Sequence, residues 1–578
     1  MPDDAVLARL QQPLVESADP HTFRLGIVLN GTVAAGAWTA GVLDMLMEAL
    51  DTWEAAKIGD PDIPQHTVRL DILGGASGGG VCAAILARAA SRRFPHVQSD
   101  AGDAANPFWQ VWVETLDIAK MLDVDDLATP AAPAAALLNG KAIRLAAEAI
   151  LNWGIGTPGV SLLLKRRAWL ADPFHVLVTL TNLRGVPYAI DFDPAADGAP
   201  CSSFYVDHAD HALFAFPAGP GTPTTAIRPD ELRIDNDFGA AVAAWKNFGE
   251  FVKATGAFPV GFPPIRLSRP SAQYDWRAAL LPRGLRDGQP QLPEVRRLTP
   301  AWSALPAADQ VGSTYIFDSV DGGACNNQPV ELVRAALAGL GGTLERDAKR
   351  ATAAVLLIDP FAAAPECPVP GPPSGLLDVA KGLANALKDQ ARFATSDLLL
   401  ALDPNVFSRF LLTAGRTNVK NTKVWGGSAI AGSGLGAFLG FIDRRYRVHD
   451  YMLGRKNCHD WLARHFVLDQ DNPVFAGFGS RPAAEDFRPA PGSRMLPIIP
   501  LVPPLRSTVP QPAWPLVDPA TDALEQLLKN RLNAVATRLG KHSDIACSGV
   551  LADLLGSWLA RYARQAIEAA AQAQQSKA

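Results

Sequence analysis

The sequence predicts an α/β protein whose central sheet is mainly parallel. A buried-strand run at residues 23–29 leads directly into a helical stretch that ends near Leu50, and a second strand at residues 68–73 is followed by another helix after Ser77. Two strand–loop–helix units so close together are typical of right-handed crossovers between parallel strands. With 578 residues and 48% hydrophobic content, the chain can also bury a large core and form two to four domains.

Composition narrows the class of protein. The net charge of −5 gives no reason to expect a nucleic-acid partner, which usually requires a strongly basic face. The six cysteines are scattered without a C-x-x-C pair, which argues against zinc sites and disulfides and suits a reducing cytoplasm. The sequence contains neither metal ligands at useful spacing nor a nucleotide signature, so we expect no metal and no cofactor. Because the N-terminus lacks an apolar secretion signal, we expect a cytoplasmic protein.

The order of the segments predicts an α/β core that is preceded by a short leader. Residues 1–22 form a polar leader, and residues 23–360 form the core. Within the core, residues 99–170 change to helices separated by Pro and Gly. This helical insertion either supplies a lid or an acyl-chain pocket, or only covers the sheet. Four further apolar runs are expected to be strands, at residues 175–183, 186–190, 315–320 and 353–358.

The remaining segments are expected to be irregular or helical. A variable Gly/Pro-rich stretch runs to about Asp237, and a helix-to-turn passage covers residues 251–264. A Pro-rich break at residues 365–373 lies near the start of a helical extension, which spans residues 361–480. Residues 481–578 begin as a Pro-rich wrap and end in helices.

A glycine-rich turn within residues 70–80 provides the strongest chemical signal. Its pentapeptide Gly75-Ala76-Ser77-Gly78-Gly79 fits the G-x-S-x-G pattern, in which a serine occupies a strained turn between a strand and a helix. The helix that begins at Gly78 directs its backbone N–H groups and the positive end of its dipole towards the serine oxygen. Ser77 is therefore the candidate nucleophile. The alternative is a Gly-rich turn that only packs tightly or binds phosphate.

A serine nucleophile also needs a base within hydrogen-bond reach. Asp321 is the candidate base, because it follows a strand and precedes Gly322 and Gly323, which allow the backbone to turn sharply beside it. Ser77 and Asp321 are so distant in sequence that only the fold can bring them together. The alternative is a solvated aspartate that opens a Gly-Gly turn.

The oxyanion that forms during attack needs hydrogen-bond donors. The turn of Gly31, Thr32 and Val33 lies between the first strand and its helix, so its free N–H groups are expected at the same edge of the sheet as Ser77. The N–H group of Gly78 adds a further donor.

These pieces, in this order, resemble the patatin-like phospholipases, a family of lipid acyl hydrolases with a Ser-Asp dyad. The resemblance covers roughly residues 23–360. Residues 447–466 also look like the C-terminal extension of some bacterial members of the family. Four elements carry the resemblance: NGTVAAGAWTAGVL at residues 30–43, GASGG at residues 75–79, ATGAFPVGFPP at residues 254–264 and DGGACNNQP at residues 321–329.

The resemblance implies a three-layer α/β/α core and a serine hydrolase of phospholipids or other acyl lipids. It implies that Ser77 attacks an ester carbonyl while Asp321 takes its proton directly, and that water then hydrolyses the acyl-enzyme. A carboxylate at its reference pKa of about 3.9 is a poor base at neutral pH, so we expect a partly desolvated Asp321 with a raised pKa. The implied partner is a lipid substrate at a membrane surface, which the protein would reach as a peripheral protein of the inner membrane.

One loop departs from the family pattern of three glycines, any residue and an arginine. In this chain Gly31 is followed by Thr32 and Val33, and Ala35 occupies the arginine position. Backbone N–H groups survive this change, but β-branched residues rarely adopt the positive φ that glycine allows. This predicts a differently shaped oxyanion hole and leaves a loss of activity open, although Ser77 and Asp321 keep their glycines.

Two other interpretations compete with a Ser-Asp hydrolase. An α/β-hydrolase with a Ser-Asp-His triad would recruit His449, His459 or His465, but that fold normally places several strands before its serine turn. The second alternative is a catalytically silent interaction protein built on the same scaffold, which the altered loop makes conceivable.

A stretch of 19 residues without a charge, at residues 424–442, raises the question of membrane contact. Its six glycines lower both its hydrophobicity and its helix propensity. The basic segment that follows, residues 443–464, has six Lys/Arg against three Asp. Three interpretations are open: a packed globular segment, an interfacial membrane contact and a true membrane span.

Overall fold

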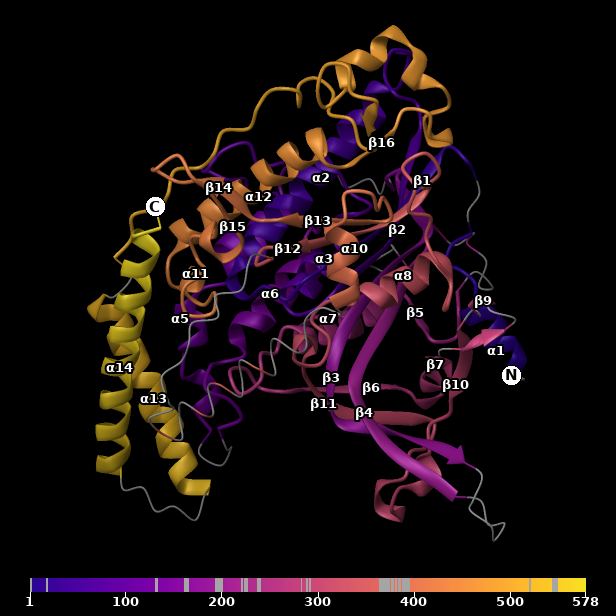
Figure 1. Cartoon of the computed structure of the whole chain (residues 1–578). Coiled ribbons are helices and arrows are strands. Elements are labelled where there is room, and N and C mark those ends of the chain that lie inside the picture. The colour runs from indigo at the N-terminus through magenta and orange to yellow at the C-terminus, as the bar shows by residue number, and fades with distance from the viewer. Residues whose placement is uncertain are drawn as a thin grey trace.

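A computed structural model of the chain describes most of its length. The described residues are 3–16, 19–129, 134–160, 166–192, 201–219, 222, 227–235, 241–281, 283–286, 289–290, 293–362, 375, 379, 382, 386, 395–518, 521–542 and 549–577. The chain is an α/β protein, as the sequence predicts, with many helices around one large sheet (Figure 1).

Among the residues that the structure describes, the central sheet has nine strands and is mainly parallel. Neighbouring strands follow the order β13-β12-β1-β2-β3-β11-β6, while β4 pairs with β3 and β5 pairs with β4. The strands from β13 to β3 pair in parallel, whereas β11 pairs antiparallel with both β3 and β6. The strand bounds are β1 (Thr22–Leu29), β2 (Thr67–Gly75), β3 (Leu170–Phe192), β4 (Cys201–Phe216), β5 (Glu231–Arg233), β6 (Ile265–Pro270), β11 (Thr314–Asp321), β12 (Ala353–Asp359) and β13 (Arg409–Thr413).

Helices cover both faces of this sheet. α2 (Gly36–Ala56) and α3 (Gly78–Ala89) share a hydrophobic cluster with Ile27 of β1 on one face. α8 (Val330–Ala338) shares a second cluster with Val28 of the same strand. Because successive residues of a strand point to opposite faces, the apolar run of β1 serves both helical layers. This arrangement is compatible with three α/β/α layers.

The helical insertion is observed as short helices, in the parts of residues 99–170 that the structure describes. Asn106 is the N-cap residue of its first helix, and the Asn106 side chain accepts hydrogen bonds from two backbone N–H groups. A π-helix interrupts the α-helical pattern, and α7 (Val242–Thr255) packs close to the insertion. The elements of the insertion are α4 (Pro107–Trp109), the π-helix Gln110–Thr115, α5 (Ile118–Met121) and α6 (Lys141–Asn152).

Strands β3 and β4 correct the expected pattern between residues 170 and 237. The two short strands expected at residues 175–183 and 186–190 form one 23-residue strand, β3. The stretch expected to be variable contains the 16-residue strand β4, which pairs with β3 as a long arm (Figure 1). Phe204 and Val206 of β4 are more than half exposed. Backbone pairing with β3, and not the burial of side chains, holds the first half of β4 in place. The sequence of this half therefore lacks the usual apolar pattern.

The expected polar leader contains a helix. α1 (Asp3–Leu10) buries Val6 and Leu10 against Trp276. Two apolar residues four positions apart lie on one face of a helix, which explains why this otherwise polar segment docks onto the core.

The region after residue 360 is less helical than expected, and the sheet continues into it. β13 pairs with β12, so the expected boundary at residue 360 does not end the sheet. The Pro-rich break at residues 365–373 lies outside the described residues. The remaining elements of this region are α10 (Thr395–Leu402), β14 (Gly415–Thr417), β15 (Lys423–Trp425), α11 (Leu439–Ile442), α12 (Arg444–Arg464), β16 (Val467–Asp469), β17 (Met495–Pro497), α13 (Asp522–His542) and α14 (Gly549–Gln575). Helices α13 and α14 lie side by side at one edge of the molecule (Figure 1).

Helix α12 crosses α2 at close range because both helices carry a glycine at the contact. A methyl group at Gly41 would lie 2.0 Å from the Tyr451 carbonyl oxygen, and one at Gly454 would lie 2.1 Å from the Trp38 carbonyl oxygen. The C-terminal region is therefore packed directly onto the helix that follows β1.

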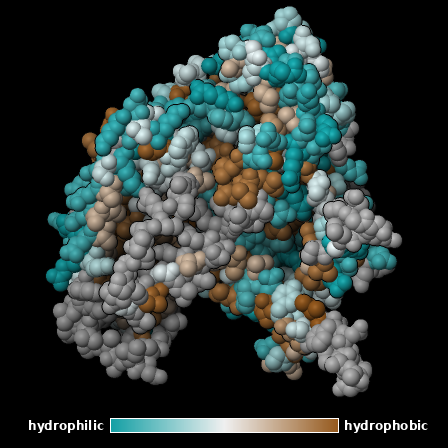
Figure 2. Space-filling model, in the orientation of Figure 1, coloured by the Kyte–Doolittle hydropathy of each residue, from teal (hydrophilic) through white to brown (hydrophobic). Residues whose placement is uncertain are grey.

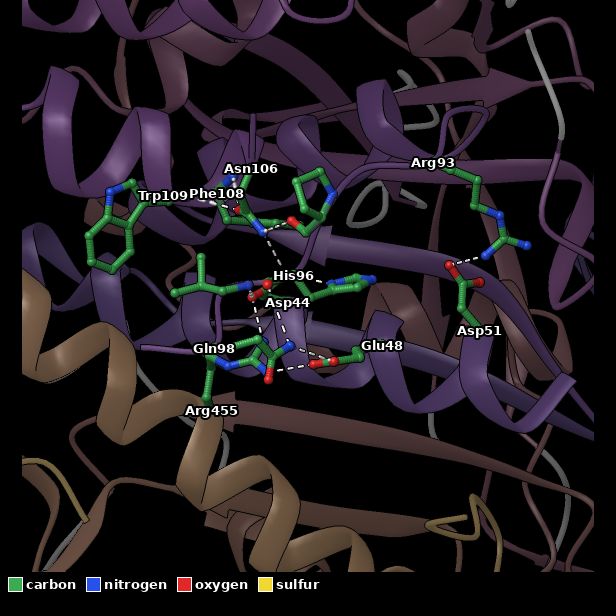
Figure 3. A network of polar contacts seen from close by, with 12 residues as sticks. Asp44, Glu48, Asp51, Arg93, His96, Gln98, Asn106, Phe108, Trp109 and Arg455 are labelled. Atoms are coloured by element: carbon green, nitrogen blue, oxygen red, sulfur yellow. Dashed lines mark hydrogen bonds and ion pairs between the residues drawn. The ribbon is translucent and has the colours of Figure 1, made fainter. Parts of the chain in front are cut away.

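A buried polar network joins the same two helices (Figure 3). Asp44 of α2 accepts a hydrogen bond from Arg455 Nη1 of α12 (2.5 Å) and one from Asn106 Nδ2 (2.8 Å), and His96 Nδ1 lies 2.7 Å from it. Arg455 also forms an ion pair with Glu48. Burial opposes ionisation of Asp44, but the charges of Arg455 and His96 hold its pKa well below the usual range. Removing Arg455 would leave the Asp44 and Glu48 carboxylates without the arginine that they share.

Residues 424–442 form the end of strand β15, a 3-10 turn at Gly426–Ser428, further turns and the short helix α11, not one long helix. This agrees with the packed interpretation, and the segment provides no helix of the length that a span needs. Within the described part of the chain, one helical stretch, Val33–Ala56, is long and apolar enough to cross a membrane by length and composition. Its most apolar window is 89% buried inside the protein, as expected for a core helix.

Candidate active site

Ser77 lies on the turn between β2 and α3, where it is the N-cap residue of α3. Its φ of 52° and ψ of −127° belong to a region that residues with a side chain rarely adopt. The Ser77 N–H donates a hydrogen bond to Thr255 Oγ1 over 3.0 Å, which helps to hold this turn. Only glycine fits at position 79, because a methyl group there would lie 2.2 Å from the Leu29 carbonyl oxygen. The structure thus shows the strained strand–turn–helix that the sequence predicts.

Asp321 ends β11 and meets Ser77, although 244 positions separate them in sequence. Ser77 Oγ donates a hydrogen bond to Asp321 Oδ2 over 2.5 Å. The other carboxylate oxygen, Oδ1, accepts a hydrogen bond from the Gly323 N–H over 2.7 Å. Gly322 allows the chain to turn here, because a methyl group at this position would lie 2.1 Å from the Thr179 carbonyl oxygen. The structure therefore brings the candidate nucleophile and the candidate base into direct contact.

The environment of Asp321 favours its neutral form. The residue is only 5% exposed, and burial raises its pKa to about 6, although the hydrogen bonds from Ser77 and Gly323 act in the opposite direction. A carboxylate with a pKa near neutrality is a stronger base than one at its usual value. The desolvated Asp321 carboxyl with a raised pKa that the sequence predicts is thus confirmed.

The loop from Gly31 to Val33 lies against Ser77. A methyl group at Gly31 would lie 3.2 Å from Ser77 Cβ, and both Val33 and Gly78 line the cavity beside Ser77. Thr32 is buried, and its Oγ1 faces the start of α3, 2.3 Å from the point that a methyl group on Gly78 would occupy. The N–H groups of these four residues donate no hydrogen bond to any residue that the structure describes. They remain free to bind an oxyanion.

Val33 corrects the expectation for the altered loop. A β-branched residue was expected to avoid positive φ, yet Val33 has a φ of 50°. The N–H groups of the next two residues fix the turn: Ala34 donates to the Ala437 carbonyl oxygen (3.2 Å), and Ala35 donates to the Thr32 carbonyl oxygen (3.0 Å). Tertiary contacts therefore impose a backbone conformation that glycine would adopt with less strain.

Asn327 belongs to the site, although sequence reasoning did not select it among the site residues. Its Nδ2 donates a hydrogen bond to Asn30 Oδ1 over 2.6 Å. Methyl groups at Gly31 and Gly323 would lie 2.1 Å and 2.5 Å from its Oδ1. Asn327 thus lies between the Gly31 loop and the turn after Asp321. The available signal was its place in the DGGACNNQP segment.

An almost entirely apolar cavity of about 60 Å³ opens beside Ser77. The insertion at residues 99–170 does more than cover the sheet, because it supplies a large part of this lining. Phe438 and Phe441 come from the uncharged segment of the C-terminal region, and no sequence pattern predicted their position. The lining includes Trp112, Leu116, Met121, Ile143, Val252, Phe258, Phe262, Phe438 and Phe441.

The segment that carries Phe438 is fixed from two sides. Asp450 of α12 accepts hydrogen bonds from the N–H groups of Ala431 (2.8 Å) and Gly432 (3.0 Å). Across the cavity, the Phe438 ring meets the Phe258 ring edge-on, with 5.7 Å between the ring centroids. The C-terminal region therefore forms one wall of the cavity.

The histidines of the rival triad have other contacts. His449 Nδ1 lies 2.9 Å from Asp450 Oδ1, and His459 Nε2 lies 2.9 Å from the Leu505 carbonyl oxygen. His465 follows α12 and lines a separate groove. In the described part of the chain, no histidine forms a hydrogen bond with the Ser77 side chain or with Asp321.

The fold and the site together define an α/β protein with a serine–aspartate pair at a strained strand–helix turn. No family model matches the chain. The chain is 33% identical over 560 residues to the uncharacterized protein y4iI of Sinorhizobium fredii, an alignment that covers 90% of this chain and 76% of the relative. The chain therefore belongs to the same family as y4iI.

Proposed function

We propose that this protein is a serine acyl hydrolase that cleaves carboxylic esters of phospholipids or other acyl lipids. The hydrogen bond of 2.5 Å between Ser77 Oγ and Asp321 Oδ2, at the edge of an apolar cavity, carries the proposal. The resemblance of the four sequence elements to the patatin-like phospholipases supports it.

The proposed reaction begins when Ser77 Oγ attacks the ester carbonyl carbon while Asp321 takes the hydroxyl proton. Collapse of the tetrahedral intermediate breaks the bond to the alcohol, which leaves with the proton from Asp321. Water then attacks the acyl-enzyme while Asp321 takes a proton from that water. Collapse of this second tetrahedral intermediate breaks the bond to Ser77 Oγ, Asp321 returns the proton to Oγ, and the acid leaves. The pKa of about 6 suits Asp321 to both roles near neutral pH.

The oxyanion is proposed to lie between the Gly31–Val33 loop and the start of α3. The free N–H groups of Gly31, Thr32, Val33 and Gly78 are the candidate donors. The positive end of the α3 dipole adds favourable electrostatics for a negative charge at this place.

The apolar lining supports an acyl chain as the group that occupies the cavity. Its volume of about 60 Å³ admits only a short acyl group. A longer chain requires Phe438 and Phe441 to move outward. Because lipid esters are presented at surfaces, we propose that the protein meets its substrate as a peripheral protein at a membrane.

Hydrolysis of p-nitrophenyl butanoate by the purified full-length chain tests the proposal. Ser77→Ala and Asp321→Asn are each expected to lower kcat by at least about a thousandfold, because each removes one of the two groups that move the proton. Ser319→Ala, which changes a buried serine on the same strand as Asp321, is the matched control. Wild-type turnover in the Asp321→Asn variant would show that the dyad assignment is wrong.

A further inference from the structure

We propose that Thr255, the last residue of α7, is a positioning residue of the serine–aspartate pair, because its hydroxyl holds the Ser77 turn within reach of Asp321. The inference rests on the proposed ester hydrolysis and adds to it a residue that touches no substrate. The end of α7 suits this role because it binds the backbone N–H groups of both members of the pair.

The sheet alone does not bring Ser77 and Asp321 together. Ser77 follows β2 and Asp321 ends β11, and β3 lies between these two strands. Since neighbouring strands lie about 4.8 Å apart, the backbones of β2 and β11 are separated by about 10 Å. The contact of 2.5 Å between the two side chains therefore depends on how the chain is held where each strand ends.

The end of α7 bridges this gap with two hydrogen bonds. The Ser77 N–H donates to Thr255 Oγ1 over 3.0 Å, and the Asp321 N–H donates to the Ala257 carbonyl oxygen over 2.9 Å. The two acceptors lie two residues apart in the chain, so both members of the pair are fixed relative to the same short piece of backbone. Loss of either hydrogen bond would change the distance over which the proton moves.

Helix α7 is itself firmly anchored. Phe248 and Phe251 of this helix are buried against the Phe214 ring of β4, with ring centroids 4.6 Å and 5.3 Å apart. The helix also packs against α3, β3 and β11. This anchoring gives the Thr255 hydroxyl a fixed position relative to the sheet.

Thr255 also packs against the first turn of α3. A methyl group at Gly80 would lie 2.7 Å from Thr255 Cγ2, so a side chain at this position would displace Thr255 or the turn. Ser77 needs such support, because its φ of 52° and ψ of −127° are strained. Among the described residues, Thr255 is the one acceptor of a hydrogen bond from the Ser77 N–H.

Thr255 acts through Ser77 and not by contact with a substrate. It is fully buried and is not one of the described residues that line the cavity beside Ser77. The space-filling view shows a hollow between the β3–β4 arm and the α13–α14 pair, and Val260 and Val320 line this hollow whereas Thr255 does not (Figure 2). Loss of the Thr255 hydroxyl should therefore lower kcat and leave KM unchanged.

Substitutions of Thr255 in the full-length chain test the inference with p-nitrophenyl butanoate. Thr255→Val keeps the branched shape and removes the acceptor, so kcat should fall by about tenfold to a hundredfold at an unchanged KM. Thr255→Ser keeps the hydroxyl and should retain most of the wild-type kcat. If Thr255→Val does not fold, Thr255→Ala takes its place, because it removes the hydroxyl without adding a methyl group.

Thr39→Val is the matched control. It makes the same change at another fully buried threonine, whose hydroxyl has no hydrogen-bond partner among the described residues. This variant should keep the wild-type kcat and KM.

The pH profile gives a second readout, which a general loss of stability would not move. The hydrogen bond from Ser77 lowers the pKa of Asp321 against the effect of burial. Among the described residues, the other group that acts on this carboxyl is the Gly323 N–H, and no charged side chain does. A displaced Ser77 would weaken its hydrogen bond, so the acidic limb of kcat/KM should move to higher pH in Thr255→Val and stay in place in Thr255→Ser.

Equal kcat in Thr255→Val and Thr255→Ser would overturn the inference, whether both variants match the wild type or both fall. A raised KM at wild-type kcat would also overturn it, because that result places Thr255 in contact with the substrate. If the wild type cleaves no ester, the proposed function fails, and the rate at which a fluorophosphonate probe labels Ser77 tests the positioning role separately. Slower labelling in Thr255→Val than in Thr255→Ser supports the inference, and equal rates overturn it.

Discussion

Replacing Asp321 by asparagine is expected to stabilise the folded protein above pH 6 while it removes the proposed base. Asp321 is buried, and burial raises its pKa from 3.8 to about 6. A tenfold change in proton affinity corresponds to about 1.4 kcal/mol, so ionising this buried carboxyl costs about 3 kcal/mol of folding free energy. Asparagine keeps a similar shape and carries no charge to desolvate.

The sign of the effect follows from the direction of the shift. Because the folded state binds the Asp321 proton more tightly than the unfolded state, the group favours folding below about pH 4. This contribution is lost as the pH rises through about 6. The Asp321→Asn variant lacks this loss, so its advantage over the wild type should be small at pH 4 and reach up to about 3 kcal/mol at pH 8.

Thermal and urea unfolding at several pH values measure this difference. If the chain unfolds in one step, 3 kcal/mol corresponds to a rise of about 2 to 3 °C in melting temperature at pH 8. Ser319→Ala serves again as the control, since it changes a neighbouring buried side chain without altering charge. An Asp321→Asn variant that is equally or less stable than the wild type at pH 8 would refute the reasoning about the buried charge.

Three further predictions concern the site and its support. The kcat/KM for ester hydrolysis should fall about tenfold per pH unit below pH 6 and level off above it, because Asp321 must be ionised to act as a base; a flat profile from pH 5 to 8 would contradict this. Phe438→Ala should widen the cavity and shift the preferred p-nitrophenyl ester towards longer acyl chains, and an unchanged chain-length profile would count against this wall. Arg455→Ala should lower the free energy of unfolding by about 3 to 5 kcal/mol, since it removes the arginine counter-ion of the buried, ionised Asp44 and leaves that charge to His96 and to neutral hydrogen-bond donors; urea titration measures this, and a loss below about 1 kcal/mol would refute it.

Sequence reasoning identified the residues that lie in tight turns, because such turns admit only certain residue types at the neighbouring positions. Ser77 is found because a serine turn this tight tolerates only glycine at positions such as Gly79, where a side chain would collide with β1. Asp321 is found for a similar reason, since Gly322 meets the backbone of β3. The alternating strands and helices around them were predicted from the apolar runs of β1 and β2. These runs are long enough to be recognised as strands from the sequence alone.

The residues that sequence reasoning missed act through contacts between distant segments. Phe438 reaches the cavity because α12 is docked onto α2 and holds the uncharged segment in place, which no local pattern shows. Val33 adopts positive φ against its own preference because the C-terminal region fixes the next residue through the Ala437 carbonyl oxygen. Strand β4 pairs with β3 although Asp207, His208, Asp210 and His211 interrupt its apolar residues, because its partner supplies the hydrogen bonds. In each case tertiary structure overrides local propensity.

Labelling with a fluorophosphonate probe, followed by digestion and mass spectrometry, is the most direct measurement of whether Ser77 is an activated nucleophile. The account predicts a covalent adduct on Ser77 in the folded wild type, a much slower reaction in Asp321→Asn, and none after unfolding in urea. An unlabelled Ser77 in the folded wild type, under conditions in which a known serine hydrolase is labelled, would contradict the account and favour an interaction protein on the same scaffold.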